Sequence, residues 1–204
     1  MPLPDELSYK DGAQVACGFG TVYEAIEKIG ICGNDAVLVT GLGPVGLAAL
    51  MLAKAMGANK LIGVEMNDYR IDLAKKLGLA DLVAKPGPDA LDQILAATGG
   101  KGVERAIDAS ASDPGRQLAI RATREWGKIA FVGEGGTCTF NPSPDIIRGQ
   151  KTIYGSWVTS SGEWKSLVER LVRWNIHPGS VITHEAPAEK AERGLQPYGR
   201  RKMR

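Results

Sequence analysis

The sequence predicts an α/β fold in which six parallel strands form a doubly wound sheet of order 3-2-1-4-5-6. Two observations lead to this prediction. Short apolar runs alternate with helical patterns along most of the chain, at the spacing of right-handed parallel crossovers. A glycine-rich turn joins the first of these runs to the helix that follows it. We therefore expect a ligand crevice where the strand order reverses, at the carboxyl ends of the first and fourth strands.

Each element follows from a local pattern of apolar residues. A first helix is predicted over 13–29, because Val22, Ile26 and Ile29 recur at helical spacing. Strands are predicted where apolar residues cluster between turn residues, at 36–40, 60–64, 82–84, 103–108, 128–132 and 152–158. Helices are predicted at 47–56, 68–77, 88–97, 112–123 and 163–174, with one further helical turn at 145–148.

Composition narrows the possible functions. The 204 residues carry a net charge of +2, and no basic face with interleaved aromatic residues is visible, so we expect no nucleic-acid partner. No apolar run is long enough to span a membrane and the first residues do not begin a signal peptide, so we expect no membrane partner. Cys17, Cys32 and Cys138 are widely spaced and odd in number, which favours a reducing, cytoplasmic location.

One segment combines a strand, a glycine turn, a helix, a second strand and an acid. Gly41 allows the sharp turn, Gly43 lets the backbone approach a pyrophosphate, and Gly46 lets the helix pack against the strand. The helix N-terminus, where Pro44 suits the first turn, offers N–H groups to phosphates. Glu65 ends the second strand, where it can accept hydrogen bonds from a ribose diol. The pattern predicts a dinucleotide site; a turn that only connects strand and helix is the alternative.

Several segments together resemble one family. The glycine turn at 41–47 resembles the coenzyme turn of the medium-chain, zinc-dependent alcohol, polyol and threonine dehydrogenases. Residues 63–65, followed by Arg70, are similar to the ribose-binding strand end of that family. Further similar segments lie at 17–23, 151–158 and 181–184, and the resemblance covers about residues 3–190.

The resemblance implies a Rossmann domain that binds NAD and serves an oxidoreductase acting on CH–OH groups when it is joined to a catalytic domain. Within the crevice predicted above, it implies that the nicotinamide carboxamide meets backbone groups of Val132, Ser156 and Val158, and that Thr21 lies nearby. The expected cofactor-binding residues are Gly41, Gly43, Pro44, Val45, Gly46, Glu65, Arg70, Ser110, Val132, Ser156, Val158 and Thr21.

The choice between NAD and NADP depends on two side chains. Glu65 carries a negative charge that would repel a 2′-phosphate, which favours NAD. Arg70 carries a positive charge that could accept that phosphate, although packing beside the ribose and adenine is the expected role. We therefore expect NAD, with NADP as the alternative.

The sequence supplies only one recognisable zinc ligand. By the resemblance, Cys17 occupies the position of a catalytic zinc ligand, and the other ligands come from an N-terminal catalytic domain that this sequence does not contain. A catalytic zinc needs about three protein ligands, and no second Cys or His lies at a suitable spacing. We expect Cys17 to be an orphaned ligand and the chain alone to bind dinucleotide without oxidising an alcohol.

The predicted organisation has three parts. Residues 1–34 lead into the coenzyme domain, residues 35–175 form it, and residues 176–204 return from it and end in a basic tail that we expect to be disordered or altered. The edge of the sixth strand is expected to form a homodimer, and a separate polypeptide could supply the catalytic domain. Two alternatives stay open: a non-enzymatic, self-associating NAD-binding module or remnant, and a methyltransferase.

Overall fold

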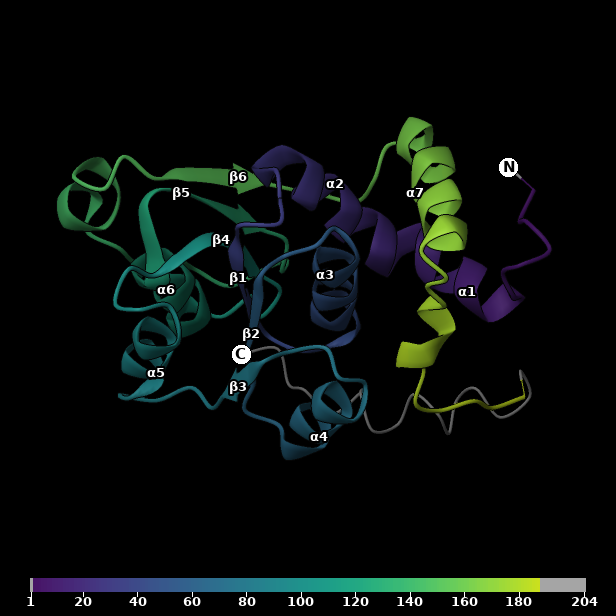
Figure 1. Ribbon diagram of the computed structural model, residues 1–204, viewed down its shortest axis with the longest axis horizontal. Coiled ribbons are helices and arrows are strands. Elements are labelled where there is room, and N and C mark those ends of the chain that lie inside the picture. Colours follow the sequence, from purple (N-terminus) through teal and green to yellow (C-terminus); the bar gives the residue numbers. More distant parts are fainter. Residues whose placement is uncertain (1, 188–204) are drawn as a thin grey trace.

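The computed structural model describes residues 2–187, and a six-stranded parallel sheet forms its centre (Figure 1). The strand order is β3-β2-β1-β4-β5-β6, which confirms the predicted fold class and topology. The order reverses between β1 and β4, so their carboxyl ends flank the expected crevice. The strands are β1 (Ala36–Thr40), β2 (Lys60–Val64), β3 (Leu82–Ala84), β4 (Val103–Asp108), β5 (Thr123–Phe131) and β6 (Thr152–Gly155).

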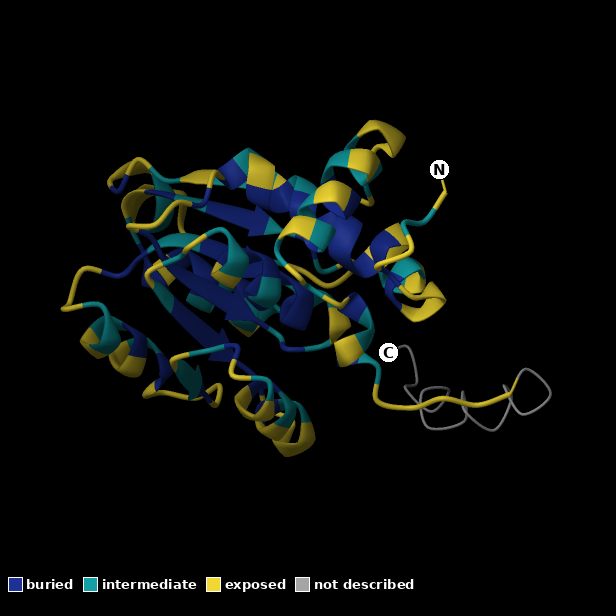
Figure 2. Ribbon diagram, turned by 45° about the vertical axis from the view of Figure 1, so that its right-hand side comes forward, coloured by how far each residue is buried: buried dark blue, intermediate teal, exposed yellow. Residues whose placement is uncertain are grey.

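Helices cover both faces of the sheet (Figure 1). The side chains of β1 alternate between two hydrophobic cores: Val37 and Val39 pack with the first set of helices, whereas Leu38 packs with the second. The strands β1, β2 and β4 at the centre of the sheet and the inner sides of the helices are mostly buried, whereas no residue of the edge strand β6 is (Figure 2). The first set is α2 (Gly20–Ile29), α3 (Pro44–Ala55) and α4 (Asp68–Lys76), with α7 (Ser161–Arg173) packed on α2; the second set is α5 (Ala90–Ala97) and α6 (Asp113–Ala122).

Local sequence determines where several helices begin and end. The side chain of Asn67 accepts a hydrogen bond from the Arg70 N–H and caps α4. Ser112 caps α6 in the same way by accepting from the Gly115 N–H at 3.2 Å. Gly30 ends α2 in the left-handed conformation, with φ of 64°. The bounds of α3 to α7 agree with the predicted helices to within three residues.

The predicted helix over 13–29 is confirmed as helical throughout and ends at Ile29 as predicted, but it begins earlier, at Tyr9, and contains a π-helical turn. The segment contains α1 (Tyr9–Gln14), the π-helical turn η1 (Val15–Phe19) and then α2. The first helix begins early because Ser8 and Asp11 form a reciprocal capping box. A π-helical turn inserts extra chain into the helix and shifts its phase, which a search for helical spacing does not detect.

Two strands also differ from their predicted bounds. β5 begins at Thr123 instead of 128, because Thr123 pairs with Val103 before a register shift. β6 ends at Gly155 instead of 158, and Val158 has a φ of 55°, which is outside the range of strands. The predicted helical turn at 145–148 is the π-helical η2 (Ser143–Ile147), and η3 (Pro178–Val181) follows α7. The predicted basic tail lies outside the described residues.

Candidate dinucleotide-binding site

The glycine turn packs directly against the loop that follows β4. Gly41 has a φ of 85°, and a Cβ added there would lie 2.7 Å from the Ser110 Cα atom. A Cβ added at Gly46 would collide with the Gly41 carbonyl group. Both positions therefore require glycine, and the close contact joins the carboxyl ends of β1 and β4 into one rim.

The second glycine leaves an open surface over the turn. A Cβ added at Gly43 would meet only the guanidinium of Arg70, at 3.8 Å. The Leu47 N–H donates to the Gly43 carbonyl at 2.9 Å, so the N–H groups of the preceding first turn, including that of Val45, are available to a ligand. With Pro44 at the first helical position, this open surface combines backbone donors, a positive helix end and a guanidinium, which fits an anionic diphosphate.

Glu65 lies immediately after β2, and its side chain forms a hydrogen bond to the backbone of the glycine turn. Its side chain is 5% exposed. One carboxylate oxygen accepts a hydrogen bond from the Leu42 N–H at 2.8 Å, and the other accepts from the N–H groups of Met66 at 2.9 Å and Asn67 at 3.0 Å. Glu65 therefore sets the shape of the turn that would hold the diphosphate.

The charge of Glu65 is stabilised where it lies. Burial by itself raises the pKa of this carboxyl group, but the backbone N–H groups of Asn67 and Leu42 and the nearby Arg70 outweigh it, so the pKa is lowered. The Arg70 Nη1 atom lies 3.5 Å from the carboxylate, and its side chain is 40% exposed. Arg70 can thus reach both Glu65 and a ligand over Gly43.

The other predicted site residues lie along the β4 to β6 side of the rim. Ser110 follows β4, and the Val132 N–H after β5 donates to the Asp108 carbonyl at 2.9 Å. Ser156 follows β6 and is buried, with its N–H bonded to the Phe131 carbonyl at 3.0 Å.

Two predicted residues stand further out on this side. Val158 is 41% exposed beyond β6. Thr21 is buried in the first turn of α2, next to Gly20, where an added Cβ would lie 3.1 Å from the Thr159 side chain. In the structure, the loops that carry five of the predicted residues contact one another directly: Gly41, Gly43, Glu65, Arg70 and Ser110. Val132 and Ser156 are connected to these loops by hydrogen bonds between neighbouring strands.

Sequence reasoning missed a buried ion pair behind this rim. Asp108 at the end of β4 is fully buried, and the Arg116 Nε atom lies 3.3 Å from its carboxylate. Arg116, Ala119 and Ile120 are all buried in α6, so a charged residue occupies the i position of an i, i+3, i+4 apolar stripe. A charge on such a stripe, eight residues after a strand-end acid, was the signal that could have indicated the pair.

The residues present do not fit a catalytic zinc site. Cys17 lies exposed in η1. Among residues 2–187, no group of three or more His, Cys, Asp or Glu side chains could hold a metal ion. Since a catalytic zinc requires about three protein ligands, Cys17 alone cannot supply the site.

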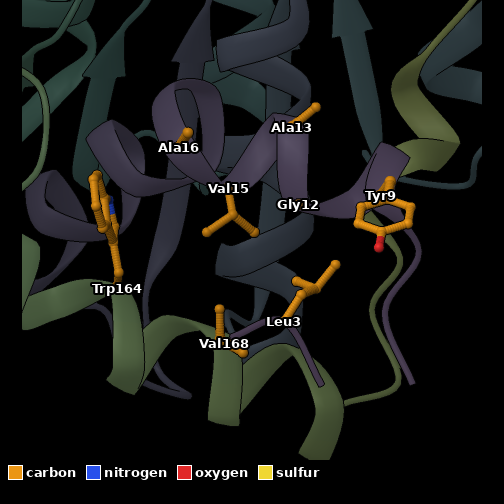
Figure 3. A pocket seen from close by; sticks show the side chains of 8 residues that line it. All are labelled: Leu3, Tyr9, Gly12, Ala13, Val15, Ala16, Trp164 and Val168. Carbon is orange, nitrogen blue, oxygen red and sulfur yellow. The ribbon is translucent and has the colours of Figure 1, made fainter. Parts of the chain in front are cut away.

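A separate hollow lies beside α1, η1 and α7, none of which contributes to the glycine turn (Figure 3). Its volume is about 370 Å³. None of the described residues that line it carries a carboxylate, imidazole or thiol group; they are Leu3, Tyr9, Gly12, Ala13, Val15, Ala16, Trp164 and Val168. The hollow is therefore mainly apolar and unlike the open surface over Gly43.

No helix within the described part of the chain has the length and apolar character needed to cross a membrane.

The doubly wound sheet, the glycine turn and the strand-end acid define the Rossmann class of nucleotide-binding folds. Residues 44–173 match the family model described as "Zinc-binding dehydrogenase". The chain belongs to this family and forms its Rossmann-like, coenzyme-binding part, which confirms the resemblance found in the sequence.

Relatives support the same assignment. The "Uncharacterized zinc-type alcohol dehydrogenase-like protein YphC" of Escherichia coli (strain K12) is 43% identical over 189 residues, which are 93% of this chain and 54% of that protein. Sorbitol dehydrogenase of Homo sapiens is 28% identical over 199 residues, 96% of this chain and 55% of that enzyme. The crystal structure of 2R,3R-butanediol dehydrogenase from Bacillus subtilis matches with a TM-score of 0.75 at 27% identity, covering 85% of this chain and 49% of that one. The chain spans about half the length of these relatives.

Proposed function

We propose that this chain binds NAD along the carboxyl edge of its sheet and serves as the coenzyme half of a dehydrogenase that acts on CH–OH groups. The observation that carries the proposal is the open surface over Gly43. There, backbone donors at the start of α3 and the Arg70 guanidinium converge, while Glu65 holds the turn in place. A turn that only connected a strand to a helix would not need a buried carboxylate to hold its backbone N–H groups in place.

In the proposed complex the diphosphate lies over Gly43 against the N-terminus of α3. The adenosine ribose lies beside Glu65, whose one acceptor site not used by a backbone N–H group, the site that Arg70 approaches, accepts from a ribose hydroxyl. The nicotinamide half lies along the loops after β4, β5 and β6, near Ser110, and its carboxamide meets backbone groups of Val132, Ser156 and Val158, with Thr21 nearby. Bound NAD supplies the hydride acceptor, and these residues bind and orient it.

NAD is preferred over NADP in this proposal. Adding a 2′-phosphate would bring its negative charge beside the buried carboxylate of Glu65, whose pKa is lowered and which therefore stays ionised at neutral pH. Arg70 offsets this repulsion only in part, because it already lies 3.5 Å from the same carboxylate. The preference thus depends on Glu65 more than on Arg70.

A titration of the purified chain tests the proposal. We expect NAD and NADH to bind more tightly than NADP, and S-adenosylmethionine not to bind, in calorimetric titrations under one set of conditions. Tighter binding of NADP would overturn the role of Glu65. Binding of S-adenosylmethionine in place of NAD would favour the methyltransferase alternative and refute the proposed coenzyme.

Zinc-assisted oxidation of an alcohol requires about three protein ligands to the metal. Cys17 is the one residue at a family zinc position, and the described residues include no metal-binding cluster. We propose that the catalytic residues come from a catalytic domain, which is part either of the same polypeptide or of a separate one. We also propose that the 204-residue chain by itself oxidises no alcohol. Sustained reduction of NAD by the purified chain with sorbitol, threonine or butanediol would refute this part of the proposal.

We also propose that the chain forms a homodimer at the β6 edge. β6 ends the strand order, so one of its sides has no strand partner among residues 2–187. Beyond its end, Trp157 is 66% exposed and Val158 is 41% exposed. Trp157→Ser should shift the mass measured by light scattering from dimer to monomer, whereas Trp126→Ser, which removes another exposed tryptophan, should not. An unaltered chain that is monomeric at all concentrations would refute the dimer.

A non-enzymatic NAD-binding module is the second candidate, and the solitary Cys17 is the observation that favours it. The two candidates predict the same NAD affinity but differ in one result. Addition of the catalytic half of the relative sorbitol dehydrogenase should permit oxidation of sorbitol if the chain is a dehydrogenase component, and should have no effect if it is a self-contained module.

A further inference from the structure

The ion pair between Arg116 and Asp108 is buried behind the part of the rim that follows β4 and β5. Arg116 is 8% exposed, and Asp108 is fully buried. Their closest atoms, Nε and Oδ2, lie 3.3 Å apart. Removing two charges from water is costly, and a buried pair is therefore weak support for a role in stability alone. This raises the question of what else the pair holds in place.

The remaining nitrogens of Arg116 bind the loop after β5. Nη2 donates to the Gly133 carbonyl at 2.6 Å, and Nη1 donates to the Thr137 carbonyl at 3.0 Å. The guanidinium also lies over the ring of Phe131, the last residue of β5, at 5.4 Å from its centroid. One planar group thus connects the end of β4 to both ends of the segment 133–137, which a lysine ammonium could not do with the same geometry.

The other oxygen of Asp108 binds the ends of β1 and β4. Oδ1 accepts from the Thr40 hydroxyl at 2.7 Å, from the Ser110 hydroxyl at 2.6 Å and from the Ser110 N–H at 3.1 Å. Ser110 in turn packs against Gly41, the first glycine of the turn. The pair therefore fixes three loops relative to one another.

The loops are also too close together to move independently. A Cβ added at Gly133 would lie 2.5 Å from the Ala111 N atom, and one added at Gly136 would collide with the Ala111 carbonyl group. Any shift of the Arg116 fork would therefore displace the loop after β5 and the loop after β4 together.

We propose that Arg116, held by Asp108, is a positioning residue for the nicotinamide half of the bound dinucleotide. This inference rests on the proposed function. In this proposal Arg116 does not touch the coenzyme itself, because it is only 8% exposed and each of its three nitrogens already donates to Asp108, Gly133 or Thr137. Instead it sets the loops that contain Ser110 and Val132. The adenosine half lies on the β1–β2 side, against Gly43 and Glu65, where Arg116 makes no contact.

Arg116→Lys tests the inference because it keeps the charge and removes the fork. The matched control is Arg121→Lys, on the same helix, where the arginine side chain is 53% exposed. The affinities of NADH and AMP are measured by calorimetry well below the unfolding temperature of each variant. Since AMP contains only the adenosine half, it reports any general damage to the fold.

We expect Arg116→Lys to weaken NADH binding roughly tenfold, the change that corresponds to the loss of about one hydrogen bond between the displaced loops and the nicotinamide carboxamide, and to leave AMP binding within about twofold. Arg121→Lys should change neither affinity. Equal losses of NADH and AMP affinity, or no loss of either, would overturn the inference.

Asp108→Asn provides a second variant if Arg116→Lys does not fold. It keeps the size of the side chain and removes the charge that orients the guanidinium, so it should also weaken NADH selectively, and an equal effect on AMP would count against the proposal. If the unaltered chain bound neither NADH nor AMP, the proposed function would be refuted first and this inference with it.

Discussion

Replacing Glu65 by glutamine should loosen the glycine turn even without a ligand. The carboxylate accepts three backbone N–H groups at 2.8 to 3.0 Å and is 5% exposed. A glutamine side chain offers one acceptor oxygen and an NH₂ group, so at least one buried N–H loses its partner. A hydrogen bond to a charged group contributes about 1.5–3 kcal/mol, which for a chain of this size lowers the unfolding temperature by roughly 3–12 °C.

The pH dependence of this loss distinguishes a lost charge from a packing defect. The pKa of Glu65 is lowered in the folded chain, so its contribution to stability is fully present above the unfolded pKa of about 4.3 and is lost as the pH falls through the lower, folded pKa. Thermal unfolding followed by circular dichroism should therefore show a large difference between the unaltered chain and Glu65→Gln at pH 7. The difference should shrink progressively in acid.

The control is Asp68→Asn, which removes the same formal charge three residues further along the chain. Asp68 is 77% exposed and pairs with Lys85 on the surface, so its replacement should shift the unfolding temperature by no more than roughly 2 °C. If Glu65→Gln unfolded at the same temperature as the unaltered chain at pH 7, or if the difference persisted unchanged in acid, the assigned role of Glu65 would be wrong.

Three further predictions use the same measurements. Gly46→Ala should abolish NADH binding, because the added Cβ would collide with the Gly41 carbonyl group. The control Gly87→Ala should bind NADH normally, because no atom lies within 4 Å of the added Cβ. Equal binding by the two variants would contradict the requirement for a close turn. Asp11→Asn should lower the unfolding temperature at pH 7 and have less effect in acid. Burial raises the pKa of Asp11, but hydrogen bonds such as that from the Gly179 N–H outweigh burial, so the pKa is lowered in the folded chain. A loss of stability that is independent of pH would contradict this prediction. Trp126→Gly should stabilise the fold by about 1 kcal/mol, because the exposed tryptophan has a φ of 60°, a strained backbone conformation that glycine adopts freely. A lower unfolding temperature would show that the contacts of Trp126 outweigh this strain.

The strand order and the glycine turn were predictable because both depend on short-range signals. A β-branched run followed by Gly41 and Pro44 specifies a strand, a turn and a helix within one continuous segment, and the handedness of crossovers then determines the order of strands. The cap at Ser112 was predictable for the same reason, since the residue that it caps lies only three positions away.

The differences from the predicted bounds have one distant cause and two local ones. β5 extends back to Thr123 because Val103, on another strand, supplies a partner, and no local pattern indicates this. β6 ends at Gly155 although the apolar run continues to Val158, because the backbone there leaves the extended region. The π-helical η1 escaped detection because a helical search assumes a constant period.

The two strand-end carboxylates show why half of the site was easier to predict than the other half. Glu65 and Asp108 each fix a loop by accepting backbone N–H groups, and each pairs with an arginine. Arg70 is 40% exposed and lies on the open surface over Gly43, so its charge faces a ligand and a family pattern can reveal it. Arg116 is buried, and its charge is used entirely within the protein.

This difference has a physical consequence for binding. The attraction between Arg70 and a diphosphate operates partly through solvent, so added salt should screen it, whereas the buried pair is shielded from ions. The adenosine and diphosphate half of the site would then depend on ionic strength, and the nicotinamide half would depend on loops already fixed before the coenzyme arrives. Binding then requires little ordering of those loops, since the hydrogen bonds of Arg116 and Asp108 already hold them.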